Sequence, residues 1–415
     1  MVALQPVRGT RDILAEDSAK FRSVVDTSRD LAGRYGYDEI ATPIFEFTGV
    51  FARTLGEATD VVTKEMYTFA DRNGDSLTLR PEGTAGVARA VISNGLAQDA
   101  PLRFYYQGPM FRHERPQKGR YRQLHQVGVE LFGVAGPLGD VEVIALGAHI
   151  IDQLGLREKI RLEVNSLGDP ESRATYREAL VSYLSGRRGD LSEESQVRVD
   201  RNPLRVLDSK NEGDRAIVAA GPMYSDYLNA ASAAFFHEVR ARLDDLGVAY
   251  VVNPTLVRGF DYYCHTAFEF ITDDLGAQGT VMAGGRYDGL VEALGGSHLP
   301  GVGWAAGIER LALLRDGKPE KVRPIALVPV GNVASDVAFR VAHELRRAGF
   351  SVDMGYSGNI GRRMKRAAKV NACVAVLIGG DEIAAGTVTV RDMDSGDQIT
   401  ASLDQVAKTL EKYKA

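Results

Sequence analysis

The sequence contains few cysteines and no long apolar run, and both absences exclude classes of protein. Its 415 residues include 2 cysteines, Cys264 and Cys373, which lie far apart and have no partners at metal-ligand or redox-motif spacing. A disulfide framework and a zinc site are therefore not expected. No apolar run of about 18 residues occurs, so no membrane-spanning helix is predicted. The opening segment MVALQPVRGTRD lacks the pattern of a signal peptide, and we therefore expect a cytoplasmic location.

Two common nucleotide-binding patterns are also missing or incomplete. The sequence holds no GxxxxGK[ST] phosphate loop, so any ATP must be bound by other residues. Gly301, Gly303 and Ala306 fit a loose dinucleotide fingerprint, but no strand is predicted before them and no βαβ unit with a ribose-binding acid follows. A nicotinamide-dependent oxidoreductase is therefore disfavoured.

The composition is that of an ordinary globular protein with more than one domain. Hydrophobic residues make up 44% of the chain and charged residues 25%. The length leaves room for two or three domains of roughly 100 to 200 residues each. The formal net charge of -5 does not exclude a nucleic-acid partner, because such binding depends on local basic patches rather than on the average charge.

Basic side chains gather at two places in the chain. A run of this kind is usually a solvated face, but two clusters in two separate domains fit a long polyanion better than a small one. One cluster is Arg112, Arg115, Lys118, Arg120 and Arg122, and the other is Arg362, Arg363, Lys365, Arg366 and Lys369.

The N-terminal part predicts an amphipathic helix over 18–35 and an extended stretch over 39–47. Pro43 interrupts that stretch, and since proline cannot donate to a sheet ladder, we expect an edge or an interface there. Residues 76–80 alternate like a strand, Pro81-Glu82-Gly83 turns, and Thr84 stands where a helix cap is expected. Glu82 is therefore predicted at a strand-to-helix corner.

A long antiparallel hairpin is predicted over 102–114 and 122–132, with a basic tip at 115–120. Side chains alternate along a strand, so Gln126, Gly128 and Glu130 share one face and Val127, Val129 and Leu131 share the other. On the partner strand Met110, Arg112 and Glu114 share a face, which favours acids and an arginine converging on one ligand. The alternative is that these polar residues only face water.

The segment LVRGFDYY adds a second arginine, Arg258, beside Gly259 and the paired Tyr262 and Tyr263. An arginine on a rigid element suits a phosphate or a carboxylate. A packed aromatic turn without a further role remains the alternative. The glycine-rich stretches at 284–285 and 301–307 are predicted to be turns that allow the backbone to approach a flat or phosphate-bearing ligand.

The remaining segments predict an insertion and a second domain. Residues 170–230 are helical and charged, and extended segments resume at 249–253 and 267–271. A helix follows at 308–314, and the linker 318–321 predicts a domain boundary. Beyond it, strands at 325–330, 351–354 and 373–378 alternate with helices, as in a small α/β domain with a mainly parallel sheet.

The segments TLRPEGT, MFRHERPQKGRYRQLHQ, LVRGFDYY, AGGRYDGL and GIERL together resemble the histidyl-tRNA synthetases of class II. The resemblance implies an α+β catalytic domain over 1–318, built on an antiparallel sheet flanked by helices, with the helical insertion at about 170–230 near the acceptor stem. It also implies a C-terminal α/β anticodon-binding domain over 324–415, and a homodimer built partly through the Pro43 strand. The one local departure from the family pattern is Cys264-His265.

The resemblance assigns roles residue by residue. Arg112 is similar to an arginine on the α-phosphate of ATP, Arg310 to one against ATP, and Arg258 to one that replaces a metal near the reacting carboxylate. The positions implied to bind histidine are Glu82, Thr84 and Gln126 for its ammonium, and Glu130, Tyr262 and Tyr263 around its ring. The positions implied to contact ATP are Arg112, Arg120, Gly284, Gly285 and Arg310. Those implied to contact tRNA are Arg115, Gln117, Lys118, Arg362, Arg363 and Lys365.

The activity implied by the resemblance is a two-step ligation. ATP, as a substrate with Mg²⁺ on its outer phosphates, activates L-histidine, and the histidyl group then moves to tRNA(His). No dedicated metal site in the protein is implied. The alternative is an inactive paralogue that binds histidine and regulates another enzyme, and the presence of both Arg112 and Arg258 argues against it.

Overall fold

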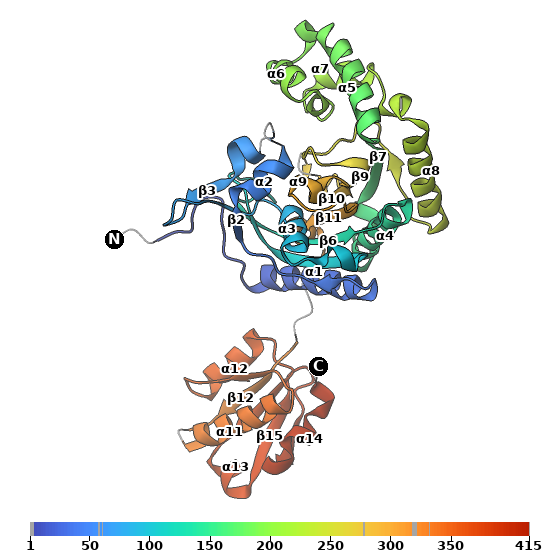
Figure 1. Cartoon of the computed structure of the whole chain (residues 1–415). Helices are drawn as coiled ribbons and strands as arrows, with labels where there is room; N and C mark the ends of the chain where they lie inside the picture. The colour runs from blue at the N-terminus through green and yellow to red at the C-terminus, as the bar shows by residue number, and fades with distance from the viewer. Residues whose placement is uncertain are drawn as a thin grey trace. The chain divides into compact units, whose positions relative to one another are not determined.

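The chain divides into two compact units, Met1–Pro319 and Glu320–Ala415, each of which is described here by itself (Figure 1). The computed structural model describes residues 4–56, 59, 61–276, 279–317, 322–331 and 333–414. The predicted linker at 318–321 lies outside these residues. Within them, no helix is long and apolar enough to cross a membrane.

The first unit is built on an eight-stranded sheet, which confirms the antiparallel core expected from the resemblance. The six central strands pair antiparallel, while the outermost strand at each edge pairs parallel to its neighbour. In order across the sheet, the strands are β1 (Asp38–Glu39), β5 (Leu102–Phe111), β6 (Gln123–Phe132), β11 (Gly301–Gly307), β10 (Thr280–Arg286), β9 (Cys264–Ile271), β7 (Arg161–Ser166) and β8 (Val251–Val252).

The two faces of the sheet meet different surroundings. Val127, Val129 and Leu131 of β6 pack in the main apolar core, as their alternation predicts. The helices that contribute to this core are α1 (Ala15–Arg34), α4 (Pro137–Gln153), α8 (Ala230–Asp245) and α10 (Ile308–Leu314). Towards the other face lie α2 (Thr48–Leu55), α3 (Thr84–Ser93) and α9 (Leu290–Ala293), and a small sheet in the order β2 (Phe45–Phe47), β4 (Ser76–Leu79), β3 (Tyr67–Ala70).

The predicted extended stretch over 39–47 is not one strand. Its first residue, Glu39, belongs to β1 in the large sheet, and its last three residues form β2 in the small sheet. Pro43 lies between them, and Arg80 fills the gap by donating to the carbonyl of Thr42 at 3.1 Å. Both pieces are edge strands of their sheets, which is where a neighbouring proline is tolerated.

The segment between β7 and β8 is helical. It contains α5 (Pro170–Ser185), α6 (Glu193–Arg201), α7 (Glu212–Ala219) and α8. The fully buried carboxylate of Asp214 accepts hydrogen bonds from the hydroxyls of Ser192, Ser195 and Ser209 at 2.6 to 2.7 Å. Burial raises the pKa of Asp214, but these hydrogen bonds outweigh it and lower that pKa to about 2. The loops between these helices are thus joined through one charged group.

The second unit holds a five-stranded sheet in the order β13 (Val352–Met354), β12 (Ile325–Pro329), β14 (Val374–Ile378), β15 (Thr387–Asp392), β16 (Gln398–Ser402). Its helices are α11 (Val333–Arg347), α12 (Ile360–Lys369), α13 (Gly380–Ala385) and α14 (Val406–Thr409).

The prediction of a mainly parallel sheet in this unit is wrong. The pairings of β12 with β13 and with β14 are parallel, but those of β15 with β14 and with β16 are antiparallel. The reason is the length of the connections, because a parallel crossover needs about a dozen residues. Only residues 379–386 separate β14 from β15, and only residues 393–397 separate β15 from β16.

Candidate active site

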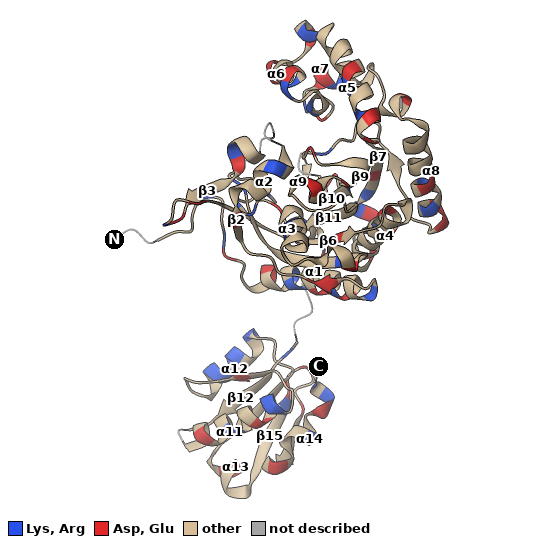
Figure 2. Cartoon of the chain, viewed as in Figure 1, with Lys and Arg blue, Asp and Glu red and all other residues tan. Residues whose placement is uncertain are grey.

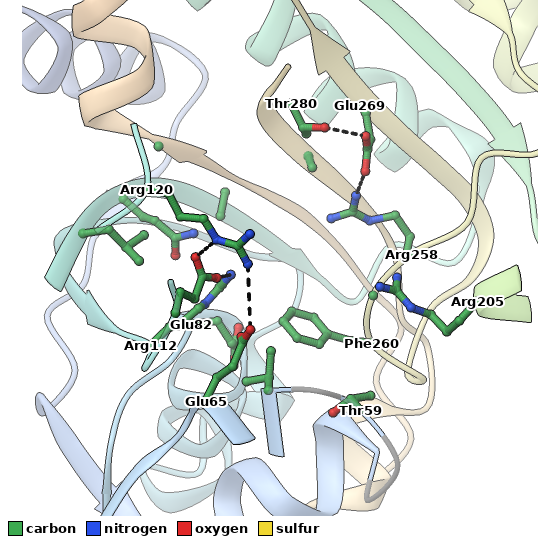
Figure 3. A pocket seen from close by; sticks show the side chains of 18 of the residues that line it. Thr59, Glu65, Glu82, Arg112, Arg120, Arg205, Arg258, Phe260, Glu269 and Thr280 are labelled. Carbon is green, nitrogen blue, oxygen red and sulfur yellow. Dashed lines mark hydrogen bonds and ion pairs between the residues drawn. The ribbon is translucent and has the colours of Figure 1, made fainter. Parts of the chain in front are cut away.

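A cavity of about 920 Å³ opens in the first unit and brings together residues from distant parts of the chain (Figure 3). Of the residues predicted from the sequence, those that line it are Glu82, Thr84, Arg112, Arg120, Gln126, Arg258, Tyr262, Tyr263 and Arg310. Predicted site residues of the first unit that are not among the lining residues are Glu130, Gly284, Gly285, Arg115, Gln117 and Lys118. Arg362, Arg363 and Lys365 belong to α12 of the second unit.

The basic tip of the hairpin is divided between the cavity and the surface. Arg112 and Arg120 line the cavity, whereas the exposed Arg115 and Lys118 remain outside it. Arg120 forms an ion pair with Glu114 in the cavity wall, and Arg112 donates from Nε to a backbone carbonyl, that of Pro81, at 2.8 Å. Buried acceptors thus draw two arginines of this cluster into the cavity, while Arg115 and Lys118 stay at the surface.

Arg258, in the loop before β9, and Arg310, on α10, also line the cavity. Arg258 donates from Nη1 to the carboxylate of Glu269 on β9. Arg310 donates from Nη1 to the carbonyl of Thr280 at 2.6 Å and from Nε to that of Gly119 at 3.1 Å. Burial lowers the pKa of Arg310, and the neighbouring guanidinium groups lower it further. The cavity is thus a place where positive charge is concentrated and partly removed from water.

The corner at Glu82 differs from the prediction in how the helix is capped. Thr84 is the first residue of α3, and its hydroxyl donates to Glu130 at 2.7 Å, so it does not cap the helix. Glu82 caps the helix instead, because its carboxylate accepts from the backbone N–H of Thr84 at 2.6 Å and of Ala85 at 2.9 Å. Burial raises the pKa of Glu82, and these two hydrogen bonds oppose the rise.

Glu130 lies beneath the cavity floor and is fully buried. Its carboxylate accepts hydrogen bonds from the hydroxyls of Thr84 and Tyr287. Burial raises the pKa of Glu130 to about 8, although both hydrogen bonds lower it. The sequence reasoning missed Tyr287, and its only signal was its place in AGGRYDGL, directly after the strand that carries the two glycines.

The glycine-rich stretches are strands rather than the predicted turns. Gly284 and Gly285 lie in β10, and residues 301–307 form β11. A Cβ at Gly285 would lie 2.9 Å from the ring of Tyr263, and one at Gly303 would lie 2.8 Å from the carboxyl carbon of Glu130. Glycine is therefore needed because large side chains lie flat against the sheet at these points.

Two buried polar atoms in the cavity wall have no hydrogen-bond partner among the described residues. They are Oε1 of Gln126, which is an acceptor, and Nε of Arg258, which is a donor. Buried polar groups are rarely left unpaired, because doing so costs about 1 to 3 kcal/mol each. The first atom suits an N–H donor of a ligand, and the second suits an anionic acceptor.

Carboxylates in the cavity are paired with arginines or backbone rather than grouped with one another. Among the described residues, no three His, Cys, Asp or Glu side chains form a group that could hold a metal ion. Glu114 is paired with Arg120, and Glu269 is paired with Arg258.

The family model described as histidyl-tRNA synthetase matches residues 9–311, and one described as anticodon binding domain matches residues 325–413. The chain belongs to the histidyl-tRNA synthetase family. Two similar proteins are the histidine–tRNA ligase of Rhodospirillum rubrum, 61% identical with 100% of both chains covered, and that of Gluconacetobacter diazotrophicus, 53% identical with 99% of both covered.

Solved structures of the family have the same fold. The apo histidyl-tRNA synthetase of S. aureus is 37% identical, covers 98% of this chain and 99% of its own, and superposes with a TM-score of 0.82. A Bacillus halodurans protein described as an ATP phosphoribosyltransferase regulatory subunit/histidyl-tRNA synthetase is 22% identical, with a TM-score of 0.68 and coverages of 92% and 99%. At that identity the second likeness shows the fold alone.

The close packing around Gly303 gives a test of the site's architecture. Gly303→Ala should lower the free energy of unfolding by about 1 to 3 kcal/mol, because the added methyl has no room between Glu130 and the backbone of Val129. Gly33→Ala is the matched control, since nothing lies within 4 Å of its Cβ position, and alanine favours a helix. Urea unfolding measures both variants. Equal stability of Gly303→Ala and the wild type would contradict this packing.

Proposed function

We propose that this protein is an ATP-dependent ligase that activates L-histidine and joins it to the 3′ end of tRNA(His). The observation that carries the proposal is the convergence of Arg112, Arg258 and Arg310 on one cavity, in a chain that is 61% identical to a histidine–tRNA ligase. Fixed cations suit a reaction in which a carboxylate must meet a phosphate, because they reduce the repulsion between the two anions.

In this proposal histidine is bound by Glu82, Thr84, Gln126, Glu130, Tyr262 and Tyr263. The unpartnered Oε1 of Gln126 would accept from the substrate ammonium, beside the carboxylate of Glu82. Thr84 would exchange its hydrogen bond to Glu130 for one to the substrate, which leaves a Glu130 oxygen for the imidazole. Tyr263 would donate to the ring from the cavity side.

ATP would bind against the remaining cations. We assign Arg112 to the α-phosphate, and Arg310 and Arg120 to the outer part of the nucleotide. We also propose that the backbone of β10 at Gly284 and Gly285 comes close to the nucleotide. Thr280, Val281, Met282 and Ala283 of β10 line the cavity and the two glycines do not, so this last assignment follows from the family resemblance alone. Mg²⁺ would enter with ATP as part of that substrate, held mainly by its phosphates.

The reaction would proceed in two displacements. A carboxylate oxygen of histidine attacks the α-phosphorus, the bond from that phosphorus to the bridging oxygen breaks, and pyrophosphate leaves. A terminal ribose hydroxyl of the tRNA then attacks the carbonyl carbon of the adenylate, and AMP leaves. Arg258 would lie between the carboxylate and the α-phosphate in the first step, so that positioning and charge stabilisation supply most of the acceleration.

The tRNA contacts would come from both units. Arg115, Gln117 and Lys118 lie at the hairpin tip, and α12 carries a cluster of basic side chains (Figure 2). On α12, Arg362 and Lys365 are exposed and would meet the phosphate backbone. Arg363 is half-buried and donates to the carbonyl of Pro329, so we expect it to position the helix as much as to contact RNA.

A second copy of the chain would cover the small sheet. Phe45, Phe47 and Phe69 on β2 and β3 are 53%, 61% and 45% exposed, and such a group of aromatic side chains favours an interface. We therefore propose a homodimer that includes the Pro43 region. As a component of translation, the protein would act in the cytoplasm.

The inactive regulatory paralogue is not favoured. The curated relatives at 61% and 53% identity are histidine–tRNA ligases. The cavity also keeps both Arg112 and Arg258, which a protein that only binds histidine does not need.

Pyrophosphate exchange into ATP, measured separately with each of the twenty amino acids, tests the proposal. Exchange should depend on histidine and proceed with no other amino acid. Exchange with a different amino acid would overturn the specificity, and an absence of exchange with all twenty would overturn the enzymatic function.

Specificity should depend on Glu130 and Tyr263. A site built to hydrogen-bond its substrate leaves buried polar groups unpaired when another amino acid enters, which is worth on the order of 10⁴ to 10⁵ in discrimination. Glu130→Ala and Tyr263→Phe should therefore raise the KM for histidine far more than the KM for ATP. Tyr224→Phe, at a fully buried tyrosine of the helical segment, is the control. Unchanged histidine kinetics in both site variants would remove these residues from the pocket.

Arg258 should matter more for activation than for transfer. Loss of one preorganised charge contact costs about 2.7 to 4 kcal/mol, or on the order of 10² to 10³ in rate. Arg258→Ala should slow adenylate formation by this factor and transfer from a preformed adenylate much less, because the second step does not join two separate anions. Lysine should restore little, since it lacks the planar fork. Single-turnover rates measure both steps, and equal losses would refute the assignment.

A further inference from the structure

Glu269 is a carboxylate in the cavity wall that no part of the proposed reaction uses. Glu269 on β9 accepts from Nη1 of Arg258, and the two side chains are 17% and 13% exposed (Figure 3). The other carboxylate oxygen of Glu269 accepts from the hydroxyl of Thr280 on β10 at 2.9 Å. The carboxylate of Glu269 is thus oriented by the hydroxyl of Thr280, and it in turn orients the guanidinium of Arg258.

A β-bulge places Thr280 where it can do this. Ala283 pairs with Glu269 and Met282 with Phe270, but Thr280 instead of Val281 pairs with Ile271. Residues paired across antiparallel strands point to the same side, and sides alternate along a strand. The extra residue therefore turns Thr280 to the side of Glu269 and Ala283, which faces the cavity, whereas regular pairing would turn it away.

The same residue also holds the other catalytic cation. The backbone carbonyl of Thr280 accepts from Nη1 of Arg310 at 2.6 Å. Thr280 therefore connects both arginines that border the strand pair, through its hydroxyl and Glu269 to Arg258, and through its carbonyl to Arg310.

The bond to Glu269 uses only one of the guanidinium nitrogens of Arg258. That nitrogen is Nη1, while Nε is buried and has no hydrogen-bond partner among the described residues. A guanidinium held at one nitrogen has lost most of its rotational freedom and keeps donors for a ligand. A buried acid also keeps the cation in place against the repulsion of the other arginines around the cavity.

We propose that Glu269 and Thr280 are positioning residues for adenylate formation, which hold the Arg258 guanidinium in the orientation that bridges the carboxylate and the α-phosphate. This inference rests on the proposed function and deepens it. Both would act through Arg258 and not on the reacting atoms themselves, so each should affect kcat for activation and leave the KM values of histidine and ATP nearly unchanged.

The main experiment compares Glu269→Gln and Thr280→Val with the wild type in histidine-dependent pyrophosphate exchange. Each should lower kcat by roughly 10- to 100-fold, the range expected when a reacting group is displaced by about 1 Å. Thr280→Ser, which keeps the hydroxyl, should recover most of the lost rate. Thr389→Val is the matched control, because it removes a threonine–glutamate hydrogen bond, to Glu382, in the second unit. That control should exchange at the wild-type rate.

A double-mutant cycle separates positioning from a general structural role. If Glu269 acts through Arg258, then Glu269→Gln should change the exchange rate of an Arg258→Ala protein by less than about twofold. The double variant should also melt at a higher temperature than Arg258→Ala alone, because the single variant leaves a buried carboxylate without its cation.

Three results would overturn the inference while leaving the proposed function in place. They are wild-type kcat in both Glu269→Gln and Thr280→Val, a loss confined to the KM values, and the same fold-loss from Glu269→Gln with and without Arg258. If the wild-type protein itself shows no histidine-dependent exchange, the proposed function fails first, and the two failures are thereby distinguished.

Discussion

Mutual repulsion among half-buried guanidinium groups is the constraint on which the site depends. Arg112, Arg120, Arg258 and Arg310 border one cavity, and in the absence of an anion each donates to an acceptor of the protein. The acceptors are the backbone carbonyls of Pro81, Gly119 and Thr280 and the carboxylates of Glu114 and Glu269. Because Glu269 and Thr280 belong to paired strands of the sheet, Arg258 and Arg310 are held near positions in which a triphosphate and a carboxylate could replace part of the protein's negative charge.

The sheet makes this arrangement possible because glycine stands at the positions where the ligand and the supporting side chains need space. The glycines of β10 and β11 let Tyr263 and Glu130 lie against the backbone, and the bulge in β10 turns Thr280 toward the cavity. The opposite face of the same strands carries the apolar side chains of the main core. One strand therefore contributes to stability on one side and to the site on the other, which explains why irregularities in pairing occur next to the cavity.

Much of the site could be predicted from local pattern and from the family resemblance. Alternation along 122–132 correctly separated Gln126 and Glu130 from the apolar side chains, and the hairpin and the corner at Glu82 were predicted in place. The errors came from interactions between segments far apart in sequence. The position of Thr84 in the sequence predicts a helix cap, but in the fold its hydroxyl donates to Glu130, 46 residues away. The glycines look like turns because nothing in their own sequence reveals the rings and carboxylates that pack over them. A role for Glu269 could not be predicted from the sequence, because it depends on the bulge in β10 and on the contact with Arg258.

In the proposed reaction, the guanidinium of Arg258 meets the carboxylate of histidine. Calorimetry with L-histidine and with L-histidinol, which has an alcohol in place of that carboxylate, tests it directly on the wild type and on Arg258→Ala. A charged hydrogen bond contributes about 1.5 to 3 kcal/mol, so Arg258→Ala should weaken histidine binding on the order of tenfold or more. Histidinol should bind both proteins with affinities that agree within about twofold, because it offers Arg258 no anion. An equal loss of affinity for the two ligands would contradict the claim.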